Sequence, residues 1–362
     1  MSNNKIYIDI NHPAHVHYFK NFIKIMESKG HTFVITNRDS KIINELLDAY
    51  NIKHCTRNSR PIKRSTVKSI FYLLGIIYKA SQISFKYKPN IYMGFASFPS
   101  TLIAFFFRKP CILMDDTEHN KKNHLLLKPF SPNILVPYYF NLNLGKNQRR
   151  FNSFVEYLYL HPDYFSPNKN ILEKYKLIEK EYVIVRYITY DAAHDSKVKP
   201  VSEPIKKQLI QELAKHFRVL LFHENTEVEE FYKPYLLSIK PEELHHIMAY
   251  AAFCLTEGAT MACEAGLMGI PYIYMNPLNV TNIEEQINLH PDLAISCSDE
   301  NVIMDVLQKK IKSLKEDNFQ NEIKVITSKI INPTKLLVWF IENYPRSKYI
   351  MQDNPDFQYQ FK

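Results

Sequence analysis

Short apolar strands alternate with helical periodicity along the chain, and this rhythm constrains the fold more than any other feature of the sequence. A β-rich run at Lys5–Ile10 is followed by a helical pattern at Val16–Ser28 and a second strand at Thr32–Thr36. Further strands are predicted at Ile91–Gly94 and Pro110–Met114. Since strands that alternate with helices form parallel sheets with helices on both faces, this half predicts a doubly wound α/β domain.

The second half repeats the rhythm, and a turn-rich segment separates it from the first. Strands are expected at Tyr182–Val185, Arg218–Phe222, Ala252–Leu255 and Pro271–Tyr274. The linker is expected at His161–Asn168, which is rich in turn-forming residues. At 362 residues the chain exceeds the roughly 250–300 residues that one core usually supports. We therefore predict two Rossmann-like domains, at residues 1–165 and 166–332, with an interdomain cleft.

The C-terminal segment, residues 333–362, forms a third part of this expectation. It begins with an apolar helical pattern from Pro333 through Ile341, and proline suits the first position of a helix. The apolar stripe predicts that this helix packs back on the N-terminal domain. After Tyr344 and Pro345 the segment is without clear periodicity, so we expect a loosely held tail.

Composition is typical of a globular protein in a reducing compartment. Hydrophobic residues make up 46% of the chain, enough for a sizeable core. The five cysteines are odd in number and scattered, without a C-x-x-C pair or a His partner at zinc spacing. The N-terminus lacks a signal-peptide pattern, and no apolar stretch reaches the roughly 18 residues of a spanning helix. The expected localisation is cytoplasmic, either free or at the inner face of the membrane.

The formal net charge of +9 predicts an anionic partner. A nucleic acid, an acidic lipid surface and a diphosphate-bearing substrate all satisfy this expectation. The lysines are spread along the chain with no recognisable nucleic-acid-binding module, so a non-catalytic nucleic-acid-binding protein ranks last and no nucleic acid is expected as partner.

The segment Leu255–Pro271 is the most informative motif. A strand ends there, a turn at Gly258 follows, and a helix of small residues begins. The free backbone N–H groups of a helix N-terminus bind diphosphate, and a glycine lets the phosphates approach closely. Glu264 follows within the helix and could accept hydrogen bonds from a ribose diol. An ordinary turn followed by a solvated glutamate is the plainer alternative.

This segment resembles the sugar-nucleotide-binding half of the glycosyltransferase-B superfamily. That superfamily includes the lipid-intermediate N-acetylglucosaminyltransferase of peptidoglycan synthesis and the UDP-N-acetylglucosamine 2-epimerases. Its members carry a Gly-rich turn, a Glu about six residues later and a Gly-x-Pro before the next strand, which Gly258, Glu264 and Gly269–Pro271 match. The resemblance implies a nucleotide-sugar site, for which the candidate residues are Arg186, Glu257, Gly258, Ala259, Thr260 and Glu264.

The loop after the first strand contains three histidines and no glycine. A dinucleotide-binding fold would place G-x-G-x-x-G there, so NAD and FAD are not expected. His15 or His17 is the preferred acid, base or acceptor-sugar contact, because imidazole titrates near neutrality. His12 is a further candidate, and some of the three could instead cap the helix or pack in the core. Their spacing is loose and lacks thiolates, so no metal is predicted.

A second group of candidates, Asp115–His119, directly follows a predicted strand. Asp116, Glu118 and His119 are candidate catalytic residues, and Asp115 is a further candidate for the site. The alternative is a capped helix start, with Asp116 or Thr117 as N-cap and Glu118 in the first turn.

Two strings in these loops, H-P-A-H-V-H and D-D-T-E-H, resemble one prokaryotic family of this superfamily, catalogued as domain of unknown function 354. The resemblance covers the chain up to about its last 20 residues. It extends to the segments Tyr157–Phe165 and Arg186–Asp195, and it implies a role in surface-polysaccharide synthesis. Arg186 is suited to bidentate phosphate recognition, and a surface arginine or an interdomain ion pair is the alternative. Further candidates for the site are Asp191 and His194, which follow Arg186, and His223, which follows the strand Arg218–Phe222.

The segment Lys63–Lys88 mixes cationic residues with a broad apolar stripe. Such a helix could lie on an anionic membrane surface, which would suit a lipid-linked acceptor. A core helix with exposed lysines is the alternative.

These features together predict a metal-independent glycosyltransferase that uses a nucleotide-sugar donor, most simply UDP-linked, and a glycan or lipid-linked acceptor. No cofactor is expected beyond the nucleotide-sugar co-substrate. A UDP-sugar 2-epimerase on the same fold is the chief alternative, and the carboxylates and histidine of Asp115–His119 would suit it.

Overall fold

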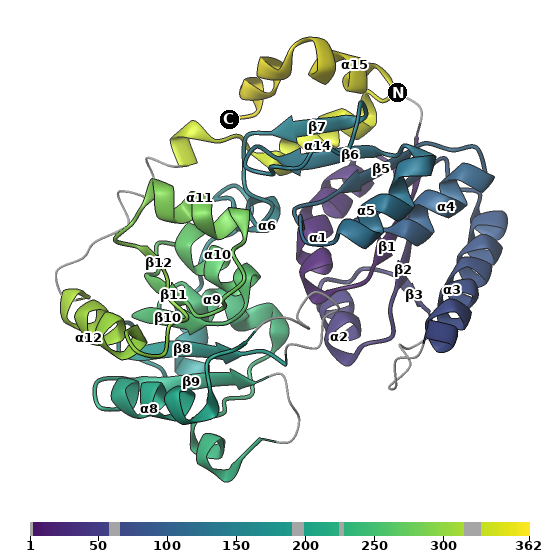
Figure 1. The fold of residues 1–362 in the computed structure, drawn as a ribbon. Coiled ribbons are helices and arrows are strands. Elements are labelled where there is room, and N and C mark those ends of the chain that lie inside the picture. Colours follow the sequence, from purple (N-terminus) through teal and green to yellow (C-terminus); the bar gives the residue numbers. More distant parts are fainter. Residues whose placement is uncertain (1–2, 58–65, 190–198, 224–227, 315–326) are drawn as a thin grey trace. The chain divides into compact units, whose positions relative to one another are not determined.

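The chain forms two compact α/β units in the computed structural model, which describes residues 3–57, 66–189, 199–223, 228–314 and 327–362 (Figure 1). Unit 1 comprises Met1–His161 and Ile330–Lys362, and unit 2 comprises Pro162–Lys329. The expected boundaries, after residues 165 and 332, lie a few residues later in the chain. Each unit contains one parallel sheet, which confirms the predicted fold class of two Rossmann-like domains.

Unit 1 is built on a seven-stranded parallel sheet of order β3-β2-β1-β4-β5-β6-β7. Its strands are β1 (Lys5–Ile10), β2 (Thr32–Asn37), β3 (His54–Thr56), β4 (Ile91–Phe95), β5 (Cys111–Met114), β6 (Asn133–Pro137) and β7 (Gln148–Phe151). The chain runs outward from β1 to β3 and then returns to β4 on the other side of β1. Ligands of open α/β sheets bind at such a switch point, outside the carboxyl ends of the two central strands.

Helices cover both faces of this sheet. One layer contains α3 (Thr66–Tyr87), α4 (Phe98–Phe106), α5 (Lys121–Leu127) and the short 3₁₀ helix η1 (Lys128–Phe130). In the other layer α1 (Pro13–Ser28) contacts α2 (Lys41–Ala49), α6 (Tyr157–Leu160) and α14 (Pro333–Glu342). Helix α14 therefore belongs to unit 1, although it follows unit 2 in the sequence.

Helix α1 begins three residues earlier than the apolar pattern predicts. The His12 side chain accepts a hydrogen bond from the Ala14 amide at the helix N-terminus, and Pro13 is the first helical residue. Proline at that position loses no hydrogen bond, because the first N–H groups of a helix have no intrahelical acceptor.

Unit 2 is built on a five-stranded parallel sheet of order β12-β11-β10-β8-β9. Its strands are β8 (Tyr182–Tyr187), β9 (Arg218–His223), β10 (Phe253–Thr256), β11 (Tyr272–Tyr274) and β12 (Ala294–Ser296). Its helices are α7 (Asn170–Lys174), α8 (Glu203–Ala214), η3 (Glu230–Tyr235), η4 (Pro241–Glu243), α9 (Leu244–Met248), α10 (Ala259–Leu267), α11 (Thr281–Leu289) and α12 (Ile303–Ser313). The switch point of this sheet lies between β8 and β10.

The C-terminal tail is ordered, so the expectation of a loosely held segment was wrong. It forms α15 (Arg346–Asp353) and the 3₁₀ helix η5 (Pro355–Phe361). The rings of Phe357 and Phe361 pack against Trp339 of α14, with centroids 4.7 and 5.5 Å away. The Gln358 side chain also accepts a hydrogen bond from the Asn152 amide. These contacts join residues far apart in the sequence, so local periodicity does not reveal them.

Candidate functional site

The carboxyl ends of β8 and β10 meet at the switch point of unit 2. Arg186 and Thr256 are register partners there, and Arg186 is only partly buried. Gly258 follows β10 immediately, and a Cβ atom placed on it would lie 3.5 Å from Nε of Arg186. The Arg186 side chain therefore lies beside the turn that begins α10, as the nucleotide-sugar hypothesis requires.

Gly258 is the N-cap of α10, and neither backbone strain nor packing explains the glycine. Its φ of −92° is open to any residue, and the added Cβ would meet only ordinary contacts. Glycine is a common N-cap, but serine, threonine, aspartate and asparagine have side-chain oxygens that accept from the first amides and glycine does not. Among the described groups, the amides of Ala259, Thr260 and Met261 donate to no acceptor. The glycine therefore leaves these amides, the first two of them in partly exposed residues, at the positive end of the helix, where an anion would be stabilised.

Glu257 stabilises the loop between β10 and α10. Its side chain is fully buried and forms an ion pair with Nζ of Lys206, at 2.8 Å. The other carboxylate oxygen accepts a hydrogen bond from the Ile188 amide, at 3.0 Å. The Glu257 amide in turn donates to the Arg186 carbonyl. Glu257 therefore ties the end of β8 to the end of β10 and holds Arg186 in place.

Glu264, the candidate ribose ligand, is buried rather than solvated on α10. One of its oxygens lies 2.9 Å from Nε2 of His245 on α9. This geometry removes the alternative of an ordinary solvated glutamate. His245 was not a candidate, because its partner lies 19 residues away on another helix.

The Gly-x-Pro motif ends α10 and begins β11. Gly269 has a φ of +76°, which glycine adopts without strain. The amides of Gly269 and Ile270 donate to the carbonyls of Gly266 and Ala265. This is a Schellman motif, which satisfies carbonyls at the end of a helix.

Unit 1 holds a buried polar network at the carboxyl end of β1 that the sequence analysis missed. Asp9 is fully buried and accepts hydrogen bonds from four side chains. These donors are Thr36, Arg57, Asn11 and Ser97, at 3.0, 2.5, 2.8 and 2.9 Å. Ser97 also accepts from the Ser100 amide as N-cap of α4. The network therefore joins the loops after β1 and β4 at the switch point of this sheet.

The three histidines of the first loop have different environments. His12 is exposed and caps α1. Burial, with the nearby His12 and Arg38, lowers the pKa of His15 well below its usual value, so His15 is neutral. Its Nδ1 accepts from the Asn11 amide at 3.4 Å, which places the single ring proton on Nε2. The ring lies on Phe95 at the end of β4.

His17 lies inside unit 1. Its ring packs against Tyr50 and Tyr159, with centroids 5.7 and 5.3 Å away, and its Nδ1 lies 3.3 Å from the Tyr50 hydroxyl. His17 therefore contributes to the contact of α1 with α2 and α6.

The acidic cluster Asp115–His119 forms a turn between β5 and α5. Asp115 is buried, accepts from the Thr117 amide and lies 2.8 Å from Nε2 of His124. Helix α5 begins only at Lys121, with Asn120 as N-cap, so the alternative of a capped helix start at Asp116 or Thr117 was wrong. Glu118 accepts from the Asn141 amide.

Asp116 is the titratable group of this turn with the most distinctive environment. Burial and then the Asp115 carboxylate raise its pKa to about 7, against an opposing hydrogen bond from Thr117. A carboxylate with a pKa near neutrality can accept a proton and return it. His119 follows three residues later in the same turn and is partly buried. Since β1 and β5 both flank β4, their carboxyl ends lie about 10 Å apart.

Three other candidate positions complete the set. His223 ends β9, with its ring 5.8 Å from that of Tyr232. Asp191 and His194 lie outside the described residues. Among the residues that the structure describes, no three His, Cys, Asp or Glu side chains are grouped to hold a metal ion.

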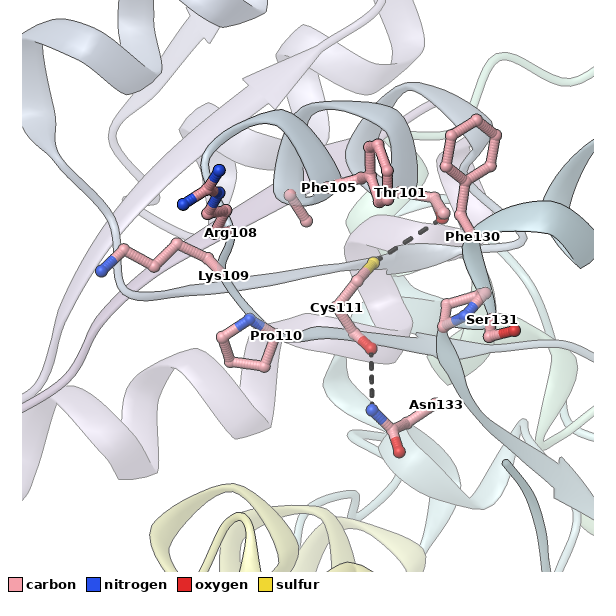
Figure 2. Close-up of a pocket in the computed structure, with 11 residues that line it drawn as sticks. Thr101, Phe105, Arg108, Lys109, Pro110, Cys111, Phe130, Ser131 and Asn133 are labelled. Carbon is pink, nitrogen blue, oxygen red and sulfur yellow. Dashed lines mark hydrogen bonds between the residues drawn. The ribbon is translucent and has the colours of Figure 1, made fainter. Parts of the chain in front are cut away.

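A cavity of about 290 Å³ lies at the opposite edge of the unit 1 sheet (Figure 2). It is lined by the amino ends of β5 and β6, including Cys111 and Asn133, and by the end of α4. Since the polar candidates lie at the carboxyl edge, this cavity is separate from the candidate site.

Comparison with known proteins agrees with this architecture. The sequence model described as "Protein of unknown function (DUF354)" matches residues 4–344. The uncharacterized protein MJ0665 of Methanocaldococcus jannaschii is 24% identical over 361 residues, which cover 95% of this chain and 99% of that protein.

Solved structures with the same fold are distant in sequence. UDP-GlcNAc 2-epimerase from Neisseria meningitidis, bound to UDP-GlcNAc, has a TM-score of 0.65 at 14% identity, over 93% of this chain and 99% of that one. The Streptomyces glycosyltransferase SsfS6 has a TM-score of 0.59 at 12% identity, over 94% and 100%. Epimerases and glycosyltransferases thus share the fold of this chain.

Proposed function

The chain belongs to the family described as proteins of unknown function, DUF354, and we propose that it is a glycosyltransferase that binds a nucleotide-activated sugar in unit 2. The observation that carries the proposal is the N-terminus of α10. Its first amides are unoccupied because glycine is the N-cap, and the Arg186 side chain lies alongside. Two adjacent phosphates would match this combination of helix dipole, amides and guanidinium.

Unit 1 would supply the acceptor site and the base. Asp116 would take the proton from the acceptor hydroxyl as the new bond to the sugar C1 forms. The bond from C1 to the donor phosphate breaks, and the nucleoside diphosphate leaves with its charge stabilised by the α10 amides and Arg186. Neutral His15 would donate its Nε2 proton as a hydrogen bond to the sugar or the acceptor.

The nucleotide of the proposed donor is UDP, and the acceptor is a glycan or a lipid-linked glycoconjugate of the cell surface. The N. meningitidis neighbour supports UDP, because its structure contains UDP-GlcNAc. Helix dipole, amides and arginine can neutralise the diphosphate, so the scheme includes no metal ion.

A UDP-sugar 2-epimerase is the second candidate, and the raised pKa of Asp116 favours it too. In that reaction a base removes and returns the proton at C2 while UDP is eliminated and added back. The structural neighbours include epimerases, which gives this candidate the same fold support.

Turnover measured with and without an acceptor distinguishes the glycosyltransferase from the epimerase. The purified chain would be incubated with a panel of UDP-sugars, alone and with a glycolipid extract, and the products resolved by NMR. A transferase releases UDP and labels glycolipid only when the acceptor is present. Formation of the 2-epimer from donor alone would instead establish the epimerase.

The matched variants are Arg186→Gln and Lys309→Gln, since Lys309 is an exposed cation of α12 in the same unit. The first should lose at least tenfold in turnover and the second should keep it. Equal activity of Arg186→Gln and the parent chain would contradict the donor site.

A further inference from the structure

Helix α3 is apolar on two faces, and only one of them is buried. Ile76, Ala80 and Ser84 form its buried stripe, which packs on the sheet of unit 1. The outward stripe carries four large side chains that are 54–75% exposed: Phe71, Leu74, Tyr78 and Phe85. Helices of soluble proteins usually present polar residues to water on that face. The alternative of a core helix with exposed lysines does not explain why these four large apolar side chains are exposed.

The neighbouring helices extend the same surface. Helix α4 contacts α3 on one side and α5 on the other, and Figure 1 shows the three side by side. Phe105 and Phe106 at the end of α4 are 58% and 65% exposed, and Leu125 and Leu126 of α5 are 71% and 50% exposed. We call these eight residues, from Phe71 to Leu126, the α3–α5 face. Large exposed apolar side chains gathered on adjacent helices are typical of an interaction surface.

The helices of the α3–α5 face and the turns after them carry exposed cations, and carboxylates are absent from these helices. Between Asp48 and Asp115 the sequence contains eleven Lys and Arg residues and no Asp or Glu. The helical segments α3, α4 and α5 also contain none. Seven exposed cations belong to these helices or to the turns that follow them: Lys86, Lys88, Arg108, Lys109, Lys121, Lys122 and Lys128. The partner of this face is therefore both apolar and anionic.

The 290 Å³ cavity adjoins the end of α4. Phe105, an exposed member of the face, lines it together with Phe130, whose ring lies 5.2 Å from that of Phe105. Arg108 and Lys109 lie at one end of the cavity in Figure 2, and Phe130 lies at the other. A hollow with aromatic rings on one side and cations at one end matches a lipid, whose phosphate and hydrocarbon are joined in one molecule.

We propose that the α3–α5 face docks on a bilayer that contains anionic phospholipids. The aromatic and leucine side chains insert at the level of the headgroups, and the lysines and arginines bind lipid phosphates. A nucleic acid is a poorer match, because Leu74, Leu125 and Leu126 have no stacking surface. The docking depends on no property of the sugar-nucleotide site, which lies in unit 2.

Vesicle co-sedimentation of the full chain tests the proposal. Vesicles of pure phosphatidylcholine and vesicles with 30% phosphatidylglycerol are compared at low and high salt. The chain should bind the anionic vesicles and lose most of this binding at high salt. F85E/F106E and R108E/K109E should each lower the affinity about tenfold or more, because each introduces two negative charges into the docking surface.

Matched controls use residues of unit 2. Ile178 is 63% exposed, and Lys309 and Lys312 are exposed on α12. I178E and K309E/K312E therefore replace an exposed apolar residue and two exposed cations by glutamate outside the α3–α5 face. Both should bind vesicles as the parent chain does. Circular dichroism of every variant establishes that it is folded.

Three results would overturn the proposal. The first is equal sedimentation with and without anionic vesicles, and the second is equal loss of binding in the control variants. In the third, F85E/F106E converts a dimer into a monomer, or abolishes oligonucleotide binding, and leaves vesicle binding unchanged. That result would assign the face to a second copy of the chain or to a nucleic acid.

Discussion

At the scale of single residues, Gly258 links the sequence most directly to the proposed donor site. A glycine N-cap stabilises a helix only slightly less than serine does, but it has no side-chain oxygen to accept from the first amides. Its φ of −92° and the ordinary contacts of an added Cβ permit replacement. We therefore attribute the glycine to its effect on the first amides of α10, which it leaves without a side-chain acceptor.

Replacing Gly258 by serine should separate stability from binding. The new hydroxyl would accept from the amide of Thr260 or Met261, so Gly258→Ser should keep or slightly raise the free energy of unfolding, by up to roughly 0.5 kcal/mol. The same hydroxyl occupies the anion site, so UDP affinity should fall about tenfold or more. Denaturant unfolding and titration calorimetry measure the two effects. A variant that binds UDP as tightly as the parent would count against the site.

Asp116 gives a pH prediction with a definite sign. Its pKa is raised to about 7 in the folded protein, so the carboxylate form, which the proposed mechanism requires as base, is lost as pH falls through 7. Activity of the parent chain should therefore decline below about pH 7. Asp116→Asn should be nearly inactive at every pH, and an unchanged pH profile in this variant would exclude Asp116 as the base.

The same shift predicts a change in stability. A raised folded-state pKa means that the folded protein binds this proton more tightly than the unfolded chain does, so stability from Asp116 is lost as pH rises from about 4 to 7. Asp116→Asn avoids that loss. Its free energy of unfolding should match the parent near pH 4 and exceed it by roughly 1–3 kcal/mol at pH 8. Urea unfolding at the two pH values would reveal the difference.

The sequence identified some residues of the candidate site and missed others for a physical reason. The turn at Gly258 is local, since a strand, a glycine and a helix adjoin in the sequence. The network around Asp9 is not local, because Arg57 lies 48 residues away and Ser97 lies 88 residues away. Pairings such as Glu264 with His245 likewise depend on the fold.

At the scale of elements, the end of α10 depends on a left-handed residue. Gly269 has a φ of +76°, a conformation that costs an L-residue about 1 kcal/mol. Gly269→Ala should therefore lower the free energy of unfolding by roughly 1 kcal/mol or more. Gly258→Ser, at the other end of the same helix, also adds a Cβ atom but carries no such backbone strain and keeps a favourable N-cap. Equal effects of the two substitutions in denaturant titrations would argue against this account.

The sequence predicted the long, strongly patterned elements better than the short ones. The strands at Lys5–Ile10 and Arg218–His223 were recognised from their apolar runs. The strand β7, Gln148–Phe151, has two arginines among four residues and went unrecognised. The ordered tail depends on Trp339, which binds it through ring contacts rather than local propensity.

At the scale of the whole molecule, the double strand-and-helix rhythm sufficed to predict two Rossmann-like units. Parallel pairing then places every strand-to-helix loop at the carboxyl edge of its sheet, which explains why Gly258 and Asp116 could be selected from sequence. The exposed apolar face of α3 could not be predicted from the sequence, because its exposure depends on which side of the helix packs on the sheet.

The central claim is that unit 2 binds a nucleoside diphosphate at α10, and thermal unfolding tests it most directly. UDP, GDP, CDP and dTDP would be added at millimolar concentration to the parent chain, Arg186→Gln and Lys309→Gln. A ligand at ten times its Kd stabilises the folded state by about 1.4 kcal/mol, which corresponds to a rise in Tm of roughly 3–5 °C for a unit of this size. We predict that rise with UDP in the parent chain and the lysine variant, and its loss in Arg186→Gln. No rise with any nucleotide, or an equal rise in all three proteins, would contradict the claim.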